Sequence, residues 1–225
     1  MTFLNVSLFL IFAAILISGC GRSELVRIRI LTPVSESKKD YSVFEDKSLS
    51  SNAKSEVVAE PKSSGGSLYL LLKSFGLGYS KISTKIEKQI NNTSDSSLVI
   101  KEKTKLDINF SDVVFGIGEN YTLMWGTGIP VGGSFESQLN YGYSGVTDEI
   151  VKSESVSGHS AFFVLGHHGF GFETLLGFRT NFLKVALKDS QSSAKTLKSQ
   201  GKIHYEKNGV LITTNQVQLG IGFTF

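Results

Sequence analysis

Large apolar side chains occupy every second position in several segments after residue 64, and a repeat of two residues is the period of a β-strand. The alternation recurs in 121–128, 135–143 and 170–178 and is clearest at the end of the chain. There, one face carries only large apolar residues: Val217, Leu219, Ile221, Phe223 and Phe225. The pattern predicts an all-β domain of antiparallel strands.

The polar faces of these segments differ from the surface of a soluble sheet. They carry Gly, Thr, Gln and Asn with an occasional Glu or Arg, whereas a soluble sheet usually carries a coat rich in Lys and Glu. Of the 23 glycines 21 follow residue 64, and so do 12 of the 16 phenylalanines. A polar inner face and an aromatic outer face are typical of a transmembrane β-barrel. A soluble β-sandwich remains the alternative, because alternation alone fits any half-buried sheet.

Eight strand-like segments can be distinguished, which is the strand number of the smallest common closed barrel. They are 68–80, 97–110, 119–130, 133–144, 158–168, 170–187, 201–206 and 210–225. The polar segments 81–97, 145–157 and 188–200 are expected to be the longer loops. The turns at 118–120 and 168–169 both have the character of short periplasmic turns, yet three segments lie between them. Either 133–144 extends an extracellular hairpin or one of the two turns faces outward.

Residues 65–225 resemble the small bacterial outer-membrane β-barrel proteins of the OmpA/OmpX-like class. The resemblance rests on 76–80 (GLGYS), on the repeated glycine–aromatic strands and on 220–225 (GIGFTF). It implies a closed antiparallel barrel in contact with outer-membrane lipid, with the N-terminal tether and the C-terminus in the periplasm. It also implies that the apolar face ending at Phe225 is an insertion signal recognised by the barrel-assembly machinery.

The first twenty residues have the character of an export signal. An unbroken apolar decamer, 8–17, has the length of a signal-peptide core and is too short to span a bilayer comfortably. Residues 17–20 (ISGC) resemble the bacterial lipobox, which predicts a signal peptide over 1–19 and lipidation of Cys20. The absence of Lys and Arg from 1–7 departs from the usual pattern. The alternatives are cleavage by the ordinary signal peptidase and a cysteine in an uncleaved anchor helix.

Residues 20–63 are expected to be a disordered tether, followed by the barrel domain over 64–225. Between 22 and 62 there are 15 charged residues and no glycine, so this stretch offers little apolar surface to bury. Residues 25–31 (LVRIRIL) alternate, and we interpret them as a basic segment beside the membrane rather than as a barrel strand.

Three charged residues, Glu136, Glu173 and Arg179, fall on faces that are expected to point inward. A carboxylate and a guanidinium inside a narrow barrel should pair, because an unpaired buried charge is costly. The alternative is a gate or selectivity ring. Eight strands leave little room for a channel, so a structural charge network is favoured.

No catalytic or metal-binding set emerges from the sequence. His159 and Ser160 are adjacent, as are His167 and His168, so in a strand each pair points to opposite faces. One cysteine provides no disulfide framework, and a formal net charge of +3 gives no reason to expect a nucleic-acid partner. Neither a cofactor nor a metal is expected.

The sequence therefore predicts a lipid-tethered integral outer-membrane barrel with a structural or surface-interaction role and no enzymatic activity. Three alternatives stay open: a passive small-solute pore, a loop-borne lipid-modifying enzyme and a soluble lipocalin-like carrier. A lipocalin would place its apolar residues inside and its charges outside, which is opposite to the faces described above.

Overall fold

The computed structural model describes residues 26–38, 56–58, 62–91, 99–140, 149–169, 172–186 and 210–225. The eight long strands are β1 (Val26–Lys38), β3 (Lys62–Leu72), β4 (Phe75–Asn91), β5 (Val99–Gly118), β6 (Tyr121–Asn140), β8 (Val156–Gly169), β9 (Phe172–Val185) and β10 (Val210–Thr224). Two short strands, β2 (Glu56–Val58) and β7 (Glu149–Ser153), pair with β4 and β6. Within these ranges no helix is long and apolar enough to cross a membrane.

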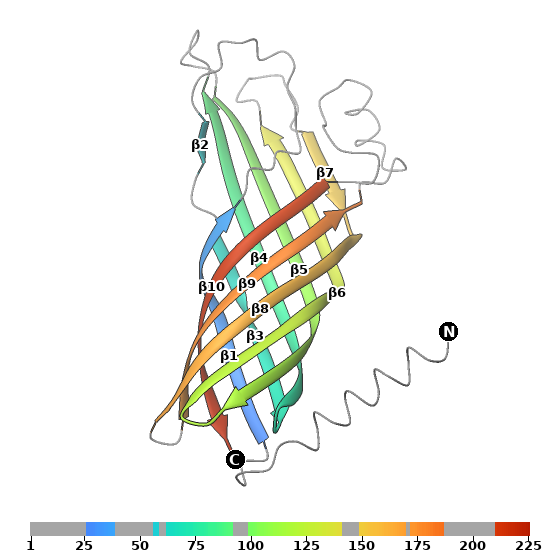
Figure 1. Ribbon diagram of the computed structural model, residues 1–225. Coiled ribbons are helices and arrows are strands. Elements are labelled where there is room, and N and C mark those ends of the chain that lie inside the picture. Colours follow the sequence, from blue (N-terminus) through green and yellow to red (C-terminus); the bar gives the residue numbers. More distant parts are fainter. Residues whose placement is uncertain are drawn as a thin grey trace, which may run out of the picture.

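The long strands form a closed antiparallel ring in the order β1-β3-β4-β5-β6-β8-β9-β10, and β10 pairs with β1 (Figure 1). The prediction of a closed eight-stranded barrel is therefore confirmed. Closure gives every long strand a partner on both sides, so the described barrel has no free sheet edge in its closed section.

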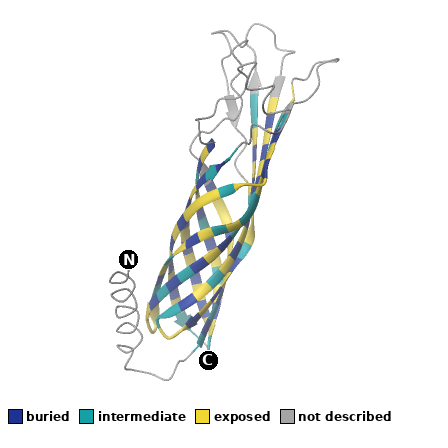
Figure 2. Ribbon diagram, turned by 90° about the vertical axis from the view of Figure 1, so that its right-hand side faces the viewer, coloured by how far each residue is buried: buried dark blue, intermediate teal, exposed yellow. Residues whose placement is uncertain are grey.

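Buried and exposed residues alternate along each strand, as the dark blue and yellow bands of Figure 2 show. Many of the exposed residues are large and apolar; they include Ile30, Leu68, Leu70, Leu77, Trp125, Ile129, Phe163, Leu165, Leu176, Leu219 and Ile221. The barrel therefore has an apolar outer band, which suits contact with lipid tails.

The first strand lies in the segment that we expected to be a tether. β1 pairs with β3 on one side and with β10 on the other, so residues 26–38 form part of the barrel wall. The Val26 and Phe225 backbones exchange hydrogen bonds, with N–O distances of 3.3 and 2.9 Å. The expected domain boundary at 64 is wrong in this respect. The high charge of the segment was misleading because Arg27 and Arg29 point into the barrel, where Arg29 pairs with Glu173, while Val26, Ile28 and Ile30 face outward.

The segment 68–80 is a hairpin rather than a single strand. β3 and β4 pair without interruption from Leu72 opposite Phe75 to Lys62 opposite Lys85, and only Lys73 and Ser74 form the turn. Lys73 has a φ of 57°, the left-handed region in which glycine or asparagine is the usual residue. The sequence therefore carries no turn signal at this position.

The segments expected at 119–130 and 133–144 belong to one strand, β6, as far as Asn140. Residues 130–133 (PVGG) have the composition of a turn but form a bulge, because Asn109 pairs with Gly132 and Phe110 pairs with Pro130. Two long strands, β6 and β8, thus lie between the turns at 118–120 and 168–169, and both turns occupy the same end of the barrel (Figure 1).

Strands also extend into two of the segments expected to be loops. β4 continues to Asn91, and 145–157 contains β7 and the start of β8. Residues 188–200, the weak strand at 201–206 and the whole of 1–25, including Cys20, lie outside the described residues.

Candidate functional site

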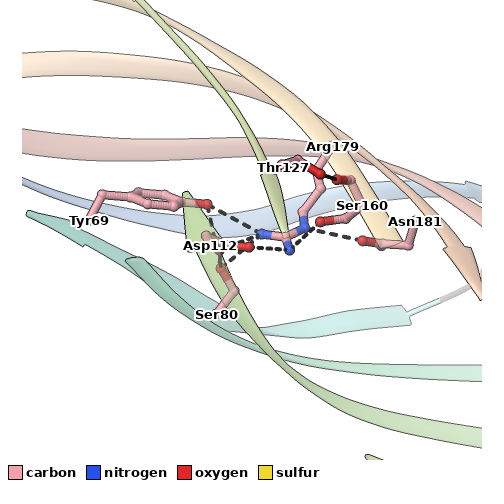
Figure 3. Close-up of polar contacts among 7 residues, drawn as sticks. All are labelled: Tyr69, Ser80, Asp112, Thr127, Ser160, Arg179 and Asn181. Atoms are coloured by element: carbon pink, nitrogen blue, oxygen red, sulfur yellow. Dashed lines mark hydrogen bonds and ion pairs between the residues drawn. The ribbon is translucent and has the colours of Figure 1, made fainter. Parts of the chain in front are cut away.

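The most elaborate polar site lies inside the barrel and centres on Arg179 of β9 (Figure 3). Its guanidinium forms a bidentate ion pair with Asp112 of β5, with Nη2–Oδ1 and Nη1–Oδ2 distances of 2.9 and 3.0 Å. Both side chains are fully buried. Two parallel N–H···O bonds between opposite charges are among the strongest pairings that side chains make.

Side chains from several other strands complete the contacts of Arg179. It donates to hydroxyl oxygens at 2.8, 2.7 and 3.3 Å, those of Ser80, Ser160 and Tyr69, and to Asn181 Oδ1 at 3.1 Å. Its guanidinium carbon lies 4.3 Å from the centre of the Phe110 ring and 5.0 Å from that of Phe162. One side chain thus connects β9 with β3, β4, β5 and β8 across the interior. Burial of this charge is offset by the partner carboxylate, the hydroxyls and the ring faces.

A glycine provides the space for this ion pair. Gly128 of β6 faces the Asp112 carboxylate, the Ser160 hydroxyl and the Arg179 guanidinium, and a Cβ atom at this position would overlap the carboxylate. The glycine-rich inner faces noted in the sequence therefore have a steric cause at this level of the barrel.

A second buried ion pair joins Arg29 of β1 to Glu173 of β9. The Nε–Oε2 and Nη2–Oε1 distances are 2.7 and 2.8 Å, and Arg29 also donates to Thr122 Oγ1 at 2.9 Å. Gly222 of β10 leaves room here, since a Cβ atom at that position would press on Glu173 and Arg29. This pair lies nearer than Arg179–Asp112 to the end of the barrel that carries the short turns.

Apolar side chains fill the barrel between and beyond the two ion pairs. One buried cluster lies between them and contains Leu31, Tyr69, Leu71, Val114, Met124, Phe162, Val164 and Leu175. On the far side of Arg179–Asp112, a further set is at most 3% exposed: Ile82, Leu106, Ile108, Phe135, Leu183 and Ile212. The interior is therefore a packed core with charged layers.

Of the three charged residues expected inside, the structure places two there. Glu173 and Arg179 share the inner face of β9, but each pairs with a residue of another strand rather than with the other. Glu136 points outward, where it pairs with Lys152 at 3.0 Å and its side chain is 45% exposed. The bulge at 130–132 inserts one extra residue, which reverses the faces of the rest of β6 and turns Phe135 inward.

The sequence analysis missed Arg29 and Asp112, the partners of the two expected residues. Arg29 lay in the supposed tether, and the strand expected at 97–110 stopped before Asp112. A usable signal was present, because both lie at inward positions of alternating segments that carry apolar residues on the opposite face.

One buried carboxylate forms no ion pair among the described residues. Glu36 of β1 is 7% exposed and accepts hydrogen bonds on Oε1 from Thr84 and Gln216, at 3.1 and 3.4 Å. Within the described part of the chain, its Oε2 atom and the Oε1 atom of Gln216 have no hydrogen-bond partner. This polar cluster lies nearer than Arg179–Asp112 to the end with the long connections.

The histidines and Ser160 do not assemble into a catalytic set. Ser160 lies inside, bound by Arg179, while the ring of His159 packs on Phe182 outside. His167 packs on Tyr121 at the outer surface. Within the described ranges, no group of three or more His, Cys, Asp or Glu residues could hold a metal ion.

The ends of β4, β5 and β6 beside the long connections carry charged residues on the outside of the barrel wall. Lys105 pairs with Asp107 at 2.7 Å, and Lys103 with Glu87 at 3.9 Å. Partial burial tends to raise the pKa of Asp107, but hydrogen bonds from Lys105 and Ser83 and the charge of Lys105 outweigh burial and hold that pKa below its usual value. The hydrogen bond to Asp107 raises the pKa of Lys105. Both residues therefore stay charged near neutral pH.

No protein-family model matches this chain, and no curated protein sequence matches it. Among solved structures, the chain is similar to Ail, the attachment invasion locus protein of Yersinia pestis, at 13% identity and a TM-score of 0.45, over 91% of this chain and 100% of that chain. It is also similar to the outer membrane protease OmpT from Escherichia coli, at 10% identity and a TM-score of 0.48, over 92% and 100% of the two chains. The outer membrane protein OprG from Pseudomonas aeruginosa gives 8% identity and a TM-score of 0.32, over 91% and 98%. Similarities this low say nothing about activity.

Proposed function

We propose that this chain is an integral protein of the bacterial outer membrane, with a non-conducting barrel and a structural or surface-interaction role. The observation that carries the proposal is the pairing of an apolar outer band with an interior closed by two buried ion pairs. A soluble barrel has no reason to expose so many large apolar side chains, whereas lipid tails solvate them.

The two ends of the barrel support one orientation in the membrane. Only two residues separate β3 from β4, β5 from β6 and β8 from β9 at one end, where Val26 and Phe225 also lie. The connections at the other end are longer. Outer-membrane barrels have short periplasmic turns and long extracellular loops, so we assign the end with the short turns to the periplasm.

The filled interior favours a closed barrel over a small-solute pore. Arg179 contacts side chains from four other strands, and apolar layers lie on both sides of it. Passage of solute would require these contacts to separate and would leave buried charges unpaired.

The lengths of β5 and β6 support a surface-interaction role. Each has 20 residues, whereas about 9–11 residues cross the hydrocarbon layer. The remaining part extends beyond the ends of β9 and β10 at the end with the long connections (Figure 1). In the proposed orientation this extension stands above the outer leaflet.

Lipid-modifying catalysis and lipocalin-like transport both have little support. A loop-borne lipid-modifying enzyme would need a nucleophile beside its base, but Ser160 and His159 point to opposite sides of the wall. A lipocalin-like carrier would need its apolar residues around an internal cavity, and here they cover the outside.

Two measurements test the proposal with the full-length chain. A heat-modifiable band should appear in the outer-membrane fraction of a bacterium that expresses it, and a soluble periplasmic protein would contradict the membrane assignment. The purified barrel in planar bilayers should be electrically silent. Steady open channels would contradict the closed interior, and a variant with the lipid-facing change Thr127→Ser provides a matched control for preparation artefacts.

A further inference from the structure

β1 and β3 stop pairing part of the way along the barrel wall. Their register ends at Leu31 opposite Ser67, although β1 continues along β10 and β3 continues along β4. Pro33 of β1 has no N–H to donate, and Gly65 of β3 has a φ of 118°, which is far from the backbone geometry of a strand. Beyond this point the described part of the seam between β1 and β3 has no backbone ladder, so side chains join its two sides.

Four polar side chains meet on the inner side of this seam. Glu36 of β1 lies opposite Gln216 of β10. On the other side of the seam, Ser63 of β3 lies opposite Thr84 of β4. Thr84 Oγ1 is 3.1 Å from Glu36 Oε1, and Gln216 Nε2 is 3.4 Å from the same oxygen. Gln216 Nε2 is also 2.9 Å from Ser63 Oγ, so side chains of four strands contact one another where the ladder is missing.

Two buried oxygens of this cluster lack a hydrogen-bond partner. Glu36 is 7% exposed and Gln216 is 2% exposed, yet Glu36 Oε2 and Gln216 Oε1 accept no hydrogen bond from the described residues. A carboxylate that is buried so deeply is normally paired with a cation or bound to a metal ion. The contacts of Glu36 in the described ranges come from a hydroxyl and an amide, which are neutral. The cluster therefore lacks a positive charge.

The spacing of these atoms suits a hard cation that takes oxygen ligands. Oxygens bind Ca²⁺ at about 2.3–2.6 Å, which places neighbouring ligands about 3.4 Å apart. A half-turn of the Gln216 amide exchanges its nitrogen and oxygen and so brings a carbonyl oxygen beside Glu36 Oε1 and Ser63 Oγ. Neighbouring oxygens of the cluster are then 2.9 to 3.4 Å apart. The Thr214 hydroxyl, which accepts from Asn181, also faces the Glu36 carboxylate.

We propose that this cluster binds one calcium ion through the Glu36 carboxylate, the Gln216 amide oxygen and the hydroxyls of Ser63, Thr84 and Thr214. A single carboxylate among neutral ligands gives weak binding, with a dissociation constant of about 10⁻⁴–10⁻³ M, the range of extracellular calcium modules. Mg²⁺ binds less well, because it requires near-octahedral ligands and gives up its water reluctantly. The ion supplies the missing charge and joins β1 and β10 to β3 and β4. This inference goes beyond the proposed function and holds for either orientation of the barrel.

The test is thermal unfolding of the full-length barrel, folded in detergent micelles and first freed of metal ions with a chelator. Ca²⁺ at about 10 mM should raise the Tm by at least about 3 °C, and the same concentration of Mg²⁺ should raise it by less than about 1 °C. Glu36→Gln should abolish the response to Ca²⁺. Asp107→Asn, which removes an equal charge from the outside of the wall, is the matched control and should respond as the wild type does. Gln216→Glu adds a second carboxylate to the site and should bind Ca²⁺ about tenfold more tightly.

Three outcomes would overturn the inference: equal responses of the wild type to Ca²⁺ and Mg²⁺, equal responses of Glu36→Gln and Asp107→Asn to Ca²⁺, or no gain in Ca²⁺ affinity for Gln216→Glu. The comparison of the two ions on the wild-type barrel needs no variant to fold. In calcium-free buffer Glu36→Gln should be at least as stable as the wild type, so its lost response reports the site rather than a damaged fold. Equilibrium dialysis against radioactive calcium should give one bound ion per wild-type barrel.

Discussion

Arg179 shows how a single side chain can organise a barrel interior. Its charge is acceptable there only because Asp112 and a ring of hydroxyls surround it. Removal of one member leaves the other charge buried without a partner, whereas removal of both leaves a polar but neutral space.

This asymmetry predicts the result of a double-mutant cycle. Arg179→Met should lower the free energy of unfolding by about 3–5 kcal/mol, and Arg179→Met combined with Asp112→Asn should lower it by less. Urea titration of the barrel folded in lipid vesicles measures both values. The exposed pair Lys105–Asp107 serves as the control and should show a coupling energy under about 1 kcal/mol. Equal coupling energies for the two pairs would contradict the buried arrangement.

Two buried carboxylates should respond in opposite ways to neutralisation. Glu173→Gln leaves the charge of the buried Arg29 guanidinium without its carboxylate partner and should lower the free energy of unfolding by about 3 kcal/mol. Glu36 pairs with no cation in the described residues, so Glu36→Gln removes a desolvation cost and should leave that free energy unchanged or raise it by about 1 kcal/mol. The same urea titrations give both values, and a large loss for Glu36→Gln would reveal a cationic partner.

At this scale the sequence predicts inward charges more reliably than it predicts their partners. Glu173 and Arg179 could be placed by alternation alone, because β9 has no irregularity. Glu136 could not be placed in this way, since the alternation of inward and outward residues that begins at Tyr121 is reversed beyond the bulge. The pairings of Arg179 with Asp112 and of Arg29 with Glu173 depend on which strands face each other across the ring, and that information is not local.

Among the elements, β1 was hidden by its composition. A window average over 22–62 mixes a strand that carries two inward arginines with a charged segment that follows it. The number of strands was correct although its members were not. β1 was missed, 68–80 merged two strands and β6 was divided, while 201–206 lies outside the described residues. The turn at Lys73–Ser74 contains no glycine, proline or asparagine, whereas the bulge at 130–133 contains one proline and two glycines. Composition therefore points to the bulge as the turn.

A proline substitution in β1 tests whether this segment is a barrel strand or a tether. Ile28 pairs with Phe223 and Leu70 on its two sides. Ile28→Pro removes a donor from the ladder and should prevent the heat-modifiable form from accumulating. Ser50→Pro, which lies outside the described residues, is the control and should fold as the wild type does. Normal folding of Ile28→Pro would mean that β1 is dispensable to the ring.

For the whole molecule, the position of β1 alters the expected role of Cys20. The lipidated cysteine was expected at the start of a tether of about 40 residues, but β1 begins at Val26. Six residues span at most about 20 Å, so a lipid on Cys20 would enter the periplasmic leaflet beside the barrel. The proposed anchor would then act as an additional contact with the membrane rather than as the end of a long flexible tether.

Cys20→Ala should therefore abolish labelling with a radioactive fatty acid and leave the heat-modifiable barrel in the outer membrane. The expected cause is that the ring is complete without residues before Val26. Equal labelling of the wild type and the variant would remove the lipobox interpretation. Loss of the folded barrel in the variant would instead show that lipidation is needed for assembly.

The seam between β1 and β10 has a consequence for the time course of folding. Val26 and Phe225, which exchange backbone hydrogen bonds, are separated by nearly the whole chain. Contacts of such high sequence separation form late and slowly, because the loop must close before they stabilise anything. Until β10 arrives, β1 exposes an unpaired edge that can pair with any other strand. The chain must therefore be held apart from its neighbours until its last strand has been exported, and the step that joins the seam sets the rate at which the barrel matures.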